Sequence, residues 1–360
     1  YDVHLATMDG PAVATLTALG FTHHVVPMNR SGRNPVKEIY TIYSLWRLFR
    51  RLRPAIVHTV TIKPVLYGGI AARLARVPGV VAAISGLGFV FTGAGVKARS
   101  LRIVATLLYR VALGHANSRV VFQNPDDSRL LQKFGAIRES QVVMIRGSGV
   151  DMQAWPIERE PEGPPVALMV ARLLKDKGVH EFVQAARLSQ GHATGLQWKI
   201  AGSLDPGNPA SVEAETLAQW REEGLVTFLG ECDDIAKQYA QSHIAVLASY
   251  REGLPKSLIE AAASGRAVVT TDVPGCRDAI VPDETGLLVP VRDAAALAAA
   301  VQRLAADNAL RHAMGQAGRR FAERVFDIRE VQRLHLETYA ALLARKQRVA
   351  PKRIEPRLPD

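Results

Sequence analysis

Residues 244–265 read IAVLASYREGLPKSLIEAAASG, and this segment contains the clearest fold signal in the chain. The apolar run Ile244–Ala248 is typical of a buried strand in a parallel sheet. The loop after it contains Gly253, which permits close approach of the backbone to a ligand, and Pro255, which fits the first turn of a helix. The helix then covers Lys256–Ser264. A strand, a glycine-containing loop and a helix in this order predict a βα unit whose helix N-terminus can bind an anion.

The same alternation of strands and helices continues outward from this stretch in both directions. We predict strands at 3–6, 55–59, 80–85, 120–124, 142–145, 166–171, 198–201, 226–229, 244–248, 267–271 and 287–289. We predict helices at 11–19, 36–53, 65–76, 98–116, 126–134, 179–189, 211–223, 233–241, 256–264, 294–306, 310–325 and 328–345. Because alternating strands and helices form parallel sheets covered on both faces, the sequence predicts an α/β protein with two Rossmann-like units.

The stretch Asp151–Pro165 interrupts this rhythm with four prolines and alternating charges, which is typical of a linker. We therefore predict a first domain at 1–150, a second at 151–326, and a helix with a basic tail at 327–360. The chain opens on what looks like a second strand, so we expect the usual opening strand and glycine loop to be missing. The two sheets are expected to face each other across a central cleft.

Length and composition agree with this organisation. The chain has 360 residues, which is more than a single core usually supports. A hydrophobic content of 48% with 22% charged residues excludes a disordered chain, a collagen or a coiled coil. The two cysteines are too few for a disulfide framework or a four-ligand zinc site. Neither a membrane-spanning run nor a signal peptide is visible, so we expect a cytoplasmic protein.

Charge is unevenly distributed along the chain. The net charge is +11, and no Asp or Glu occurs from Ile39 to Pro125. Such a field attracts a phosphate-bearing substrate, an anionic membrane surface or a nucleic acid. Aromatic residues make up only 6% and no stacking motif lies among the basic residues, which argues against nucleic acid. The helices predicted at 36–53 and 98–116 combine arginines with apolar stripes, which indicates peripheral contact with an anionic bilayer.

Two pairs of charged residues carry the chemistry of the second domain. Glu252 and Glu260 are eight positions apart, or about 12 Å along a helix. This spacing suits two separate contacts to one long ligand better than an acid/base pair that acts on one bond. Arg172 and Lys177 flank a short loop after the strand at 166–171. A guanidinium and an ammonium at the carboxyl end of a strand are suited to clamping a diphosphate.

The first domain offers a weaker pattern, His58-Thr-Val-Thr61-Ile-Lys63-Pro. We expect His58 to end a strand, where an acceptor would lie. The run SGLGF at 85–89 suggests a dinucleotide loop but lacks the full glycine spacing.

Taken together, these residues resemble the retaining glycosyltransferases of family 4, which have the two-domain GT-B architecture. Glu252 and Glu260 match the family's E-x7-E signature, and Arg172 and Lys177 match its donor-diphosphate cations. The first half resembles members that extend polyprenyl-diphosphate-linked sugars in bacterial surface-glycan assembly. The final helix, 328–345, is expected to cross back to the first domain.

The resemblance implies a role for each candidate residue. Those with implied catalytic roles are Glu252, Arg172, Lys177 and His58. Those with implied donor-binding roles are Gly253, Leu254, Pro255, Leu258, Glu260 and Gly202. Those with implied acceptor-binding roles are Lys63, Thr61 and Arg99. The donor is expected to be a UDP-sugar carrying a hexose or an N-acetylhexosamine, with no metal and no other cofactor.

The implied activity is transfer of this sugar to a polyprenyl-diphosphate-linked acceptor, with the protein held peripherally on the inner face of the plasma membrane. A nonhydrolysing nucleotide-sugar epimerase of the same fold is the alternative. An epimerase would change the sugar of a UDP-sugar without any acceptor.

Overall fold

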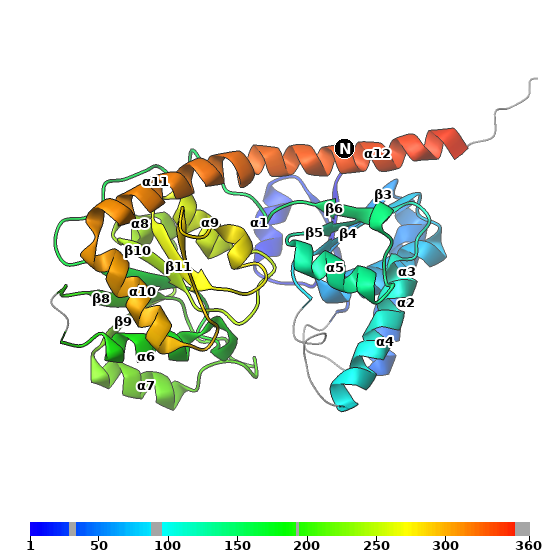
Figure 1. Ribbon diagram of the computed structural model, residues 1–360. Coiled ribbons are helices and arrows are strands. Elements are labelled where there is room, and N and C mark those ends of the chain that lie inside the picture. The colour runs from blue at the N-terminus through cyan, green and yellow to red at the C-terminus, as the bar shows by residue number, and fades with distance from the viewer. Residues whose placement is uncertain (29–33, 88–95, 192–193, 350–360) are drawn as a thin grey trace, which may run out of the picture. The chain divides into compact units, whose positions relative to one another are not determined.

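A computed structural model describes residues 1–28, 34–87, 96–191 and 194–349 (Figure 1). Its contacts divide the chain into two compact units. Unit 1 contains residues 1–122, 128–143 and the chain from His335 onward, and unit 2 contains residues 123–127 and 144–334.

Unit 1 contains a two-stranded sheet and a four-stranded sheet. Strands β1 (His4–Thr7) and β2 (Thr22–Val25) pair in parallel, and the other sheet has the order β3-β4-β5-β6. The latter strands are β3 (Ile56–Val60), β4 (Gly79–Ile84), β5 (Ser118–Phe122) and β6 (Val142–Met144). The helices are α1 (Ala12–Ala18), α2 (Pro35–Leu52), α3 (Ile62–Ala75), α4 (Val96–Leu113) and α5 (Pro125–Lys133), of which α5 begins in the 123–127 segment of unit 2. Strand β2 was absent from our prediction because its sequence, THHV, is short and polar.

Unit 2 is a six-stranded sheet with the order β12-β11-β10-β7-β8-β9. Its strands are β7 (Val166–Val170), β8 (Gln197–Ala201), β9 (Val226–Gly230), β10 (Ile244–Leu247), β11 (Ala267–Thr271) and β12 (Gly286–Val289). Its helices are α6 (Val179–Leu188), α7 (Ala214–Glu223), α8 (Ile235–Ala240), α9 (Lys256–Ala263), α10 (Ala294–Ala306) and α11 (Asn308–Val325). Counted in chain order the strands read 3-2-1-4-5-6, which is the Rossmann order, so the predicted α/β class is confirmed.

The last helix, α12 (Ile328–Val349), begins in unit 2 and continues into unit 1. Within unit 1 it is fixed by a hydrogen bond, because the side-chain amide of Asn117 donates to the carbonyl of Leu342 at 2.9 Å. The predicted return of the final helix to the first domain is confirmed. The tail at 350–360 lies outside the described residues.

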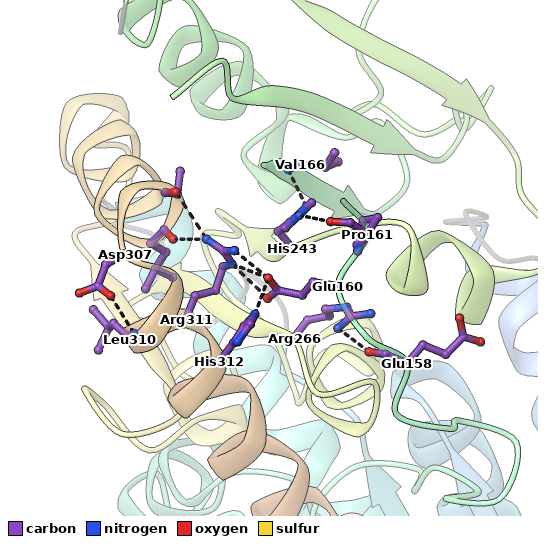
Figure 2. Close-up of polar contacts among 12 residues, drawn as sticks. Glu158, Glu160, Pro161, Val166, His243, Arg266, Asp307, Leu310, Arg311 and His312 are labelled. Atoms are coloured by element: carbon purple, nitrogen blue, oxygen red, sulfur yellow. Dashed lines mark hydrogen bonds and ion pairs between the residues drawn. The ribbon is translucent and has the colours of Figure 1, made fainter. Parts of the chain in front are cut away.

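The predicted linker is bound to unit 2 along part of its length (Figure 2). The Glu160 carboxylate accepts hydrogen bonds from Arg311, which is 3% exposed, and from His312. The carbonyl of Pro161 bonds the ring of His243 at 3.0 Å, and the carbonyl of Glu158 accepts from Arg266 at 3.1 Å. This segment therefore belongs to the second unit's surface.

Candidate functional site

The predicted donor residues of unit 2 lie where the strand order of its sheet reverses. Strands β7 and β10 are parallel neighbours, with Ile244 beside Ala167. Their outgoing connections run to helices α6 and α9, and ligands of such sheets bind at this switch point beyond the carboxyl ends. The loop after β7 carries Arg172 and Lys177, and the loop after β10 carries Glu252.

A salt bridge joins these two loops. The Lys177 Nζ atom lies 2.5 Å from the Oε1 atom of Glu252, and the hydroxyl of Ser249 donates to the same oxygen at 2.7 Å. Both charged side chains are largely buried, with 22% and 12% of their surface exposed. Because this oxygen has two donors, the Glu252 carboxylate is held in one orientation.

The backbones of the two loops also approach each other closely. A Cβ atom at Gly178 would lie 2.1 Å from the carbonyl oxygen of Ala248, and the φ angle of Gly178 is +75°. Only glycine accommodates both conditions. The amide of Tyr250 donates to the carbonyl of Asp176 at 2.9 Å. This approach brings Lys177 to Glu252.

The loop between Glu252 and helix α9 presents backbone donors. Within the part of the chain that the structure describes, the amides of Gly253 and Leu254 donate no hydrogen bond, whereas the amide of Glu252 donates to Pro274. Pro255 lies immediately before α9 instead of in its first turn, because its ψ angle of 122° is extended. Leu258 is buried on the first turn of the helix. The free amides and the helix N-terminus make this loop suited to an anion.

Arg172 lies in an ion pair that the sequence did not predict. Its guanidinium pairs with Asp205, which also accepts from the side-chain amide of Asn208 at 3.0 Å. Gly202 supports this arrangement at the end of β8, because a Cβ atom there would lie 1.9 Å from the carbonyl oxygen of Ala171. About half of the Arg172 side chain is exposed, so its remaining donors can reach a ligand.

Glu260 is a buried carboxylate on helix α9. Its side chain is 9% exposed and lies 3.1 Å from the ammonium of Lys256, whose own side chain is 66% exposed. Burial raises the pKa of Glu260 above its ordinary value, although Lys256 acts in the opposite direction. Burial also raises the pKa of the Cys276 thiol to about 12, with a smaller contribution from Glu252, so the thiol stays protonated.

The candidate residues of unit 1 have different surroundings. His58 lies inside β3 and does not end it, because Val60 continues the pairing with Ala83. Its Nδ1 atom is 2.6 Å from the Tyr339 hydroxyl, and its ring stacks on His335 with the centroids 5.5 Å apart. Burial, assisted by His335, lowers the pKa of His58 to about 4, so the ring is neutral at physiological pH.

The three predicted acceptor residues are distributed over two helices. Thr61 precedes α3 with a φ angle of 72°, and Lys63 lies in the first turn of that helix. The predicted start at residue 65 was therefore three residues late. The Lys63 ammonium pairs with Glu38 at 2.9 Å. Arg99 is exposed on α4. Their roles toward an acceptor stay predictions.

A short segment from 123–127 supports the donor loop, and the sequence did not reveal it. The side-chain amide of Asn124, which is fully buried, donates to the carbonyl of Gly253 at 2.7 Å. Asp127, also buried, pairs with Arg251. Asn124 before a proline and two aspartates signals a helix start, but nothing in the sequence links it to a loop 129 positions away.

A surface depression of unit 2 lies at the opposite edge of the sheet, beside the amino ends of the strands. Its volume is about 980 Å³, and the segment around Glu160 lines it together with Arg266 and Arg311. The described residues contain no cluster of three or more metal-binding side chains. None of the helices in the described ranges has the length and hydrophobicity that a membrane crossing requires.

Comparisons with known proteins assign this geometry to a family. The family model described as "Glycosyl transferases group 1" matches residues 154–321, and the one described as "Glycosyl transferase 4-like" matches residues 1–124. The chain belongs to the family 4 glycosyltransferases. This enzyme class decides against the epimerase.

Two curated relatives of this glycosyltransferase cover most of its length. The N,N'-diacetylbacillosaminyl-diphospho-undecaprenol alpha-1,3-N-acetylgalactosaminyltransferase of Campylobacter jejuni is 29% identical over 82% of this chain and 80% of its own. The capsular polysaccharide biosynthesis glycosyltransferase CapM of Staphylococcus aureus is 26% identical over 90% of this chain and 86% of its own.

A solved structure has the same fold. Anabaena HepE in complex with UDP-glucose superimposes with a TM-score of 0.74, at 18% identity, over 94% of this glycosyltransferase and 91% of its own chain. The GT-B architecture expected from the sequence is confirmed.

Proposed function

We propose that this family 4 glycosyltransferase is retaining and metal-independent, and that it moves a hexose or N-acetylhexosamine from a UDP-sugar to a polyprenyl-diphosphate-linked acceptor during surface-glycan assembly. One observation carries the proposal. The loops after β7 and β10 bring two cations, a fixed carboxylate and the free amides of Gly253 and Leu254 to the switch point of one Rossmann sheet.

In this proposal the donor diphosphate binds between Arg172, Lys177 and the loop amides. Lys177 has three donors, so it can keep its bond to Glu252 while it binds a phosphate oxygen. The cations stabilise the negative charge that develops on the leaving UDP, which is the role a metal ion has in other transferases. Glu252, held by Ser249, then accepts hydrogen bonds from hydroxyls of the donor sugar.

Retention follows when the acceptor hydroxyl attacks the anomeric carbon on the face that UDP leaves. The bond from the anomeric carbon to the phosphate oxygen breaks, and the hydroxyl proton passes to the departing phosphate. Glu260, about one turn into α9, accepts hydrogen bonds from the ribose hydroxyls. The UDP preference draws support from HepE, whose structure contains UDP-glucose.

The acceptor class draws support from the Campylobacter relative, whose name specifies a diphospho-undecaprenol substrate. His58, Thr61, Lys63 and Arg99 are the residues of unit 1 that we propose for the acceptor side. An acceptor with a polyprenyl chain resides in a bilayer, so we place the protein on the inner face of the plasma membrane, where its basic first unit meets anionic lipid.

A donor panel followed by a transfer assay tests the proposal. We expect UDP-sugars, and not GDP- or ADP-sugars, to raise the temperature of thermal unfolding. We then expect transfer to a polyprenyl-diphosphate-linked sugar in excess EDTA, with the anomeric configuration of the donor retained. Activity that is lost in EDTA and restored by Mg²⁺ would contradict the metal-independent mechanism, and an inverted product would contradict retention.

A further inference from the structure

We propose that the exposed face of helix α4 is the surface that inserts into an anionic bilayer. This inference rests on the proposed function, because a lipid-linked acceptor is what brings the enzyme to a membrane. It adds to that function a named helix face, which neither the family nor the donor site specifies.

The helix has an apolar stripe on its solvent side. Five large apolar residues at i, i+1, i+4, i+5 and i+8 are each between 41% and 57% exposed, namely Ile103, Val104, Leu107, Leu108 and Val111. The opposite side holds the buried residues Tyr109, Ala112 and Leu113. A helix that covers a sheet normally has polar residues on its outer face, so this outer face is built for an apolar environment.

Two arginines border the stripe in the part of the chain that the structure describes, and neither is paired with a carboxylate. Arg73 of α3 donates to the carbonyl of Val111 at 2.6 Å, and Arg110 donates to the carbonyl of Gly135 at 2.9 Å. Both guanidinium groups bond only to carbonyls within the described chain, and no Asp or Glu occurs in the sequence from 39 to 125. Apolar side chains flanked by arginines are the combination that anionic lipid headgroups bind.

Helix α2 has the same composition at its exposed side. Val36, Tyr40 and Tyr43 are 75%, 58% and 49% exposed, and the exposed Arg47 and Arg50 continue this side toward the end of the helix. In unit 1, helix α3 packs against both α2 and α4, so the three helices form one layer (Figure 1). Tyrosines on such a surface suit the headgroup region of a bilayer.

The charge favours a bilayer over a second copy of this chain. Two copies joined at α4 would bring together helices that carry arginines and contain no Asp or Glu in their sequence, and like charges across an interface oppose association. An anionic bilayer would instead attract these arginines, because its headgroups carry the opposite charge.

Flotation of the full chain with lipid vesicles tests the inference. The vesicles are phosphatidylcholine with or without phosphatidylglycerol, and the test variant is Leu107→Glu with Leu108→Glu. The matched control is Leu188→Glu on α6 in unit 2, where the leucine is 45% exposed. We expect binding only to the anionic vesicles, a loss of about tenfold or more in the double variant, and no change in the control. Thermal unfolding and UDP-sugar binding confirm that each variant is folded.

Three results would overturn the inference. The first is equal vesicle binding by the parent chain and the double variant. The second is a dimer that the double variant converts to a monomer in solution. The third is a double variant that still binds vesicles but fails to transfer sugar to the acceptor in detergent, which would assign the stripe to the acceptor chain. A parent that binds vesicles but transfers no sugar to any acceptor would contradict the proposed function and leave this surface supported.

Discussion

Replacing Glu260 by glutamine should stabilise the fold and weaken donor binding at the same time. The side chain is 9% exposed, and burial raises its pKa. A group whose pKa is higher in the folded state contributes stability at low pH that is lost as the pH rises through that raised value. Glutamine keeps the shape of the side chain without the charge, so the variant should gain stability over the parent as the pH rises through this window.

The magnitudes follow from the surroundings of the carboxylate. The salt bridge with the exposed Lys256 is worth only about 0.3–0.5 kcal/mol. Its loss therefore destabilises the variant by less than the removal of the buried charge stabilises it. A hydrogen bond between ribose and a charged carboxylate contributes about 1.5–3 kcal/mol, so donor affinity should fall about 10- to 150-fold.

Two measurements on one pair of proteins check this prediction. Chemical unfolding from acid to neutral pH gives the stability difference, and titration calorimetry with a UDP-sugar gives the dissociation constant. Glu330→Gln is the control, because Glu330 forms an exposed salt bridge with Arg333 on helix α12, outside the loops after β7 and β10. An unchanged dissociation constant would refute the ribose role, and lower stability at neutral pH would refute the argument from burial.

Other variants test other parts of the structure. Lys177→Ala should reduce turnover by 100-fold or more, on the order of 3 kcal/mol for a buried cation, whereas the exposed Lys256→Ala should have a mild effect; equal small losses in kcat/KM would contradict the site. Asn124→Ala should lower donor affinity by on the order of tenfold, because the carbonyl of Gly253 loses its buried donor; calorimetry with a UDP-sugar measures this, and unchanged affinity would show that the loop holds without it. The pKa of His58 is lowered to about 4, so the unfolded chain takes up more protons between that value and about 6.5. Stability should therefore fall as the pH drops through this range, by up to about 3 kcal/mol, and His58→Gln should flatten the profile; a variant with the parent's pH dependence would contradict this.

The periodic and apolar parts of the fold were predictable from the sequence. Strand β11 and helix α10 have the predicted bounds, 267–271 and 294–306, because a buried β-branched run and an alanine-rich run capped by an aspartate leave no competing structure. The linker prediction at Asp151–Pro165 identified the break in rhythm. It did not reveal that Glu160 binds the segment to unit 2, since that bond depends on Arg311, which is distant in sequence.

The site was predictable in its residues and not in their contacts. The E-x7-E spacing and the cations after β7 made Glu252, Glu260, Arg172 and Lys177 the candidate residues, and their roles toward a donor stay predictions. The pairing of Lys177 with Glu252 was not predictable, because that contact requires β7 and β10 to be neighbours in the sheet. Asn124 donates to a backbone carbonyl that is distant in sequence, so no local sequence pattern reveals this contact.

The placement of residues 123–127 in unit 2 affects any attempt to engineer this enzyme by exchanging halves. A chimaera with a single junction in the 144–165 region would combine the donor loop of one parent with the Asn124 and Asp127 of the other. To transfer the sugar preference of another enzyme, residues 123–127 must therefore be exchanged together with the donor loop. The alternative is a parent that already has the same residues at positions 124 and 127.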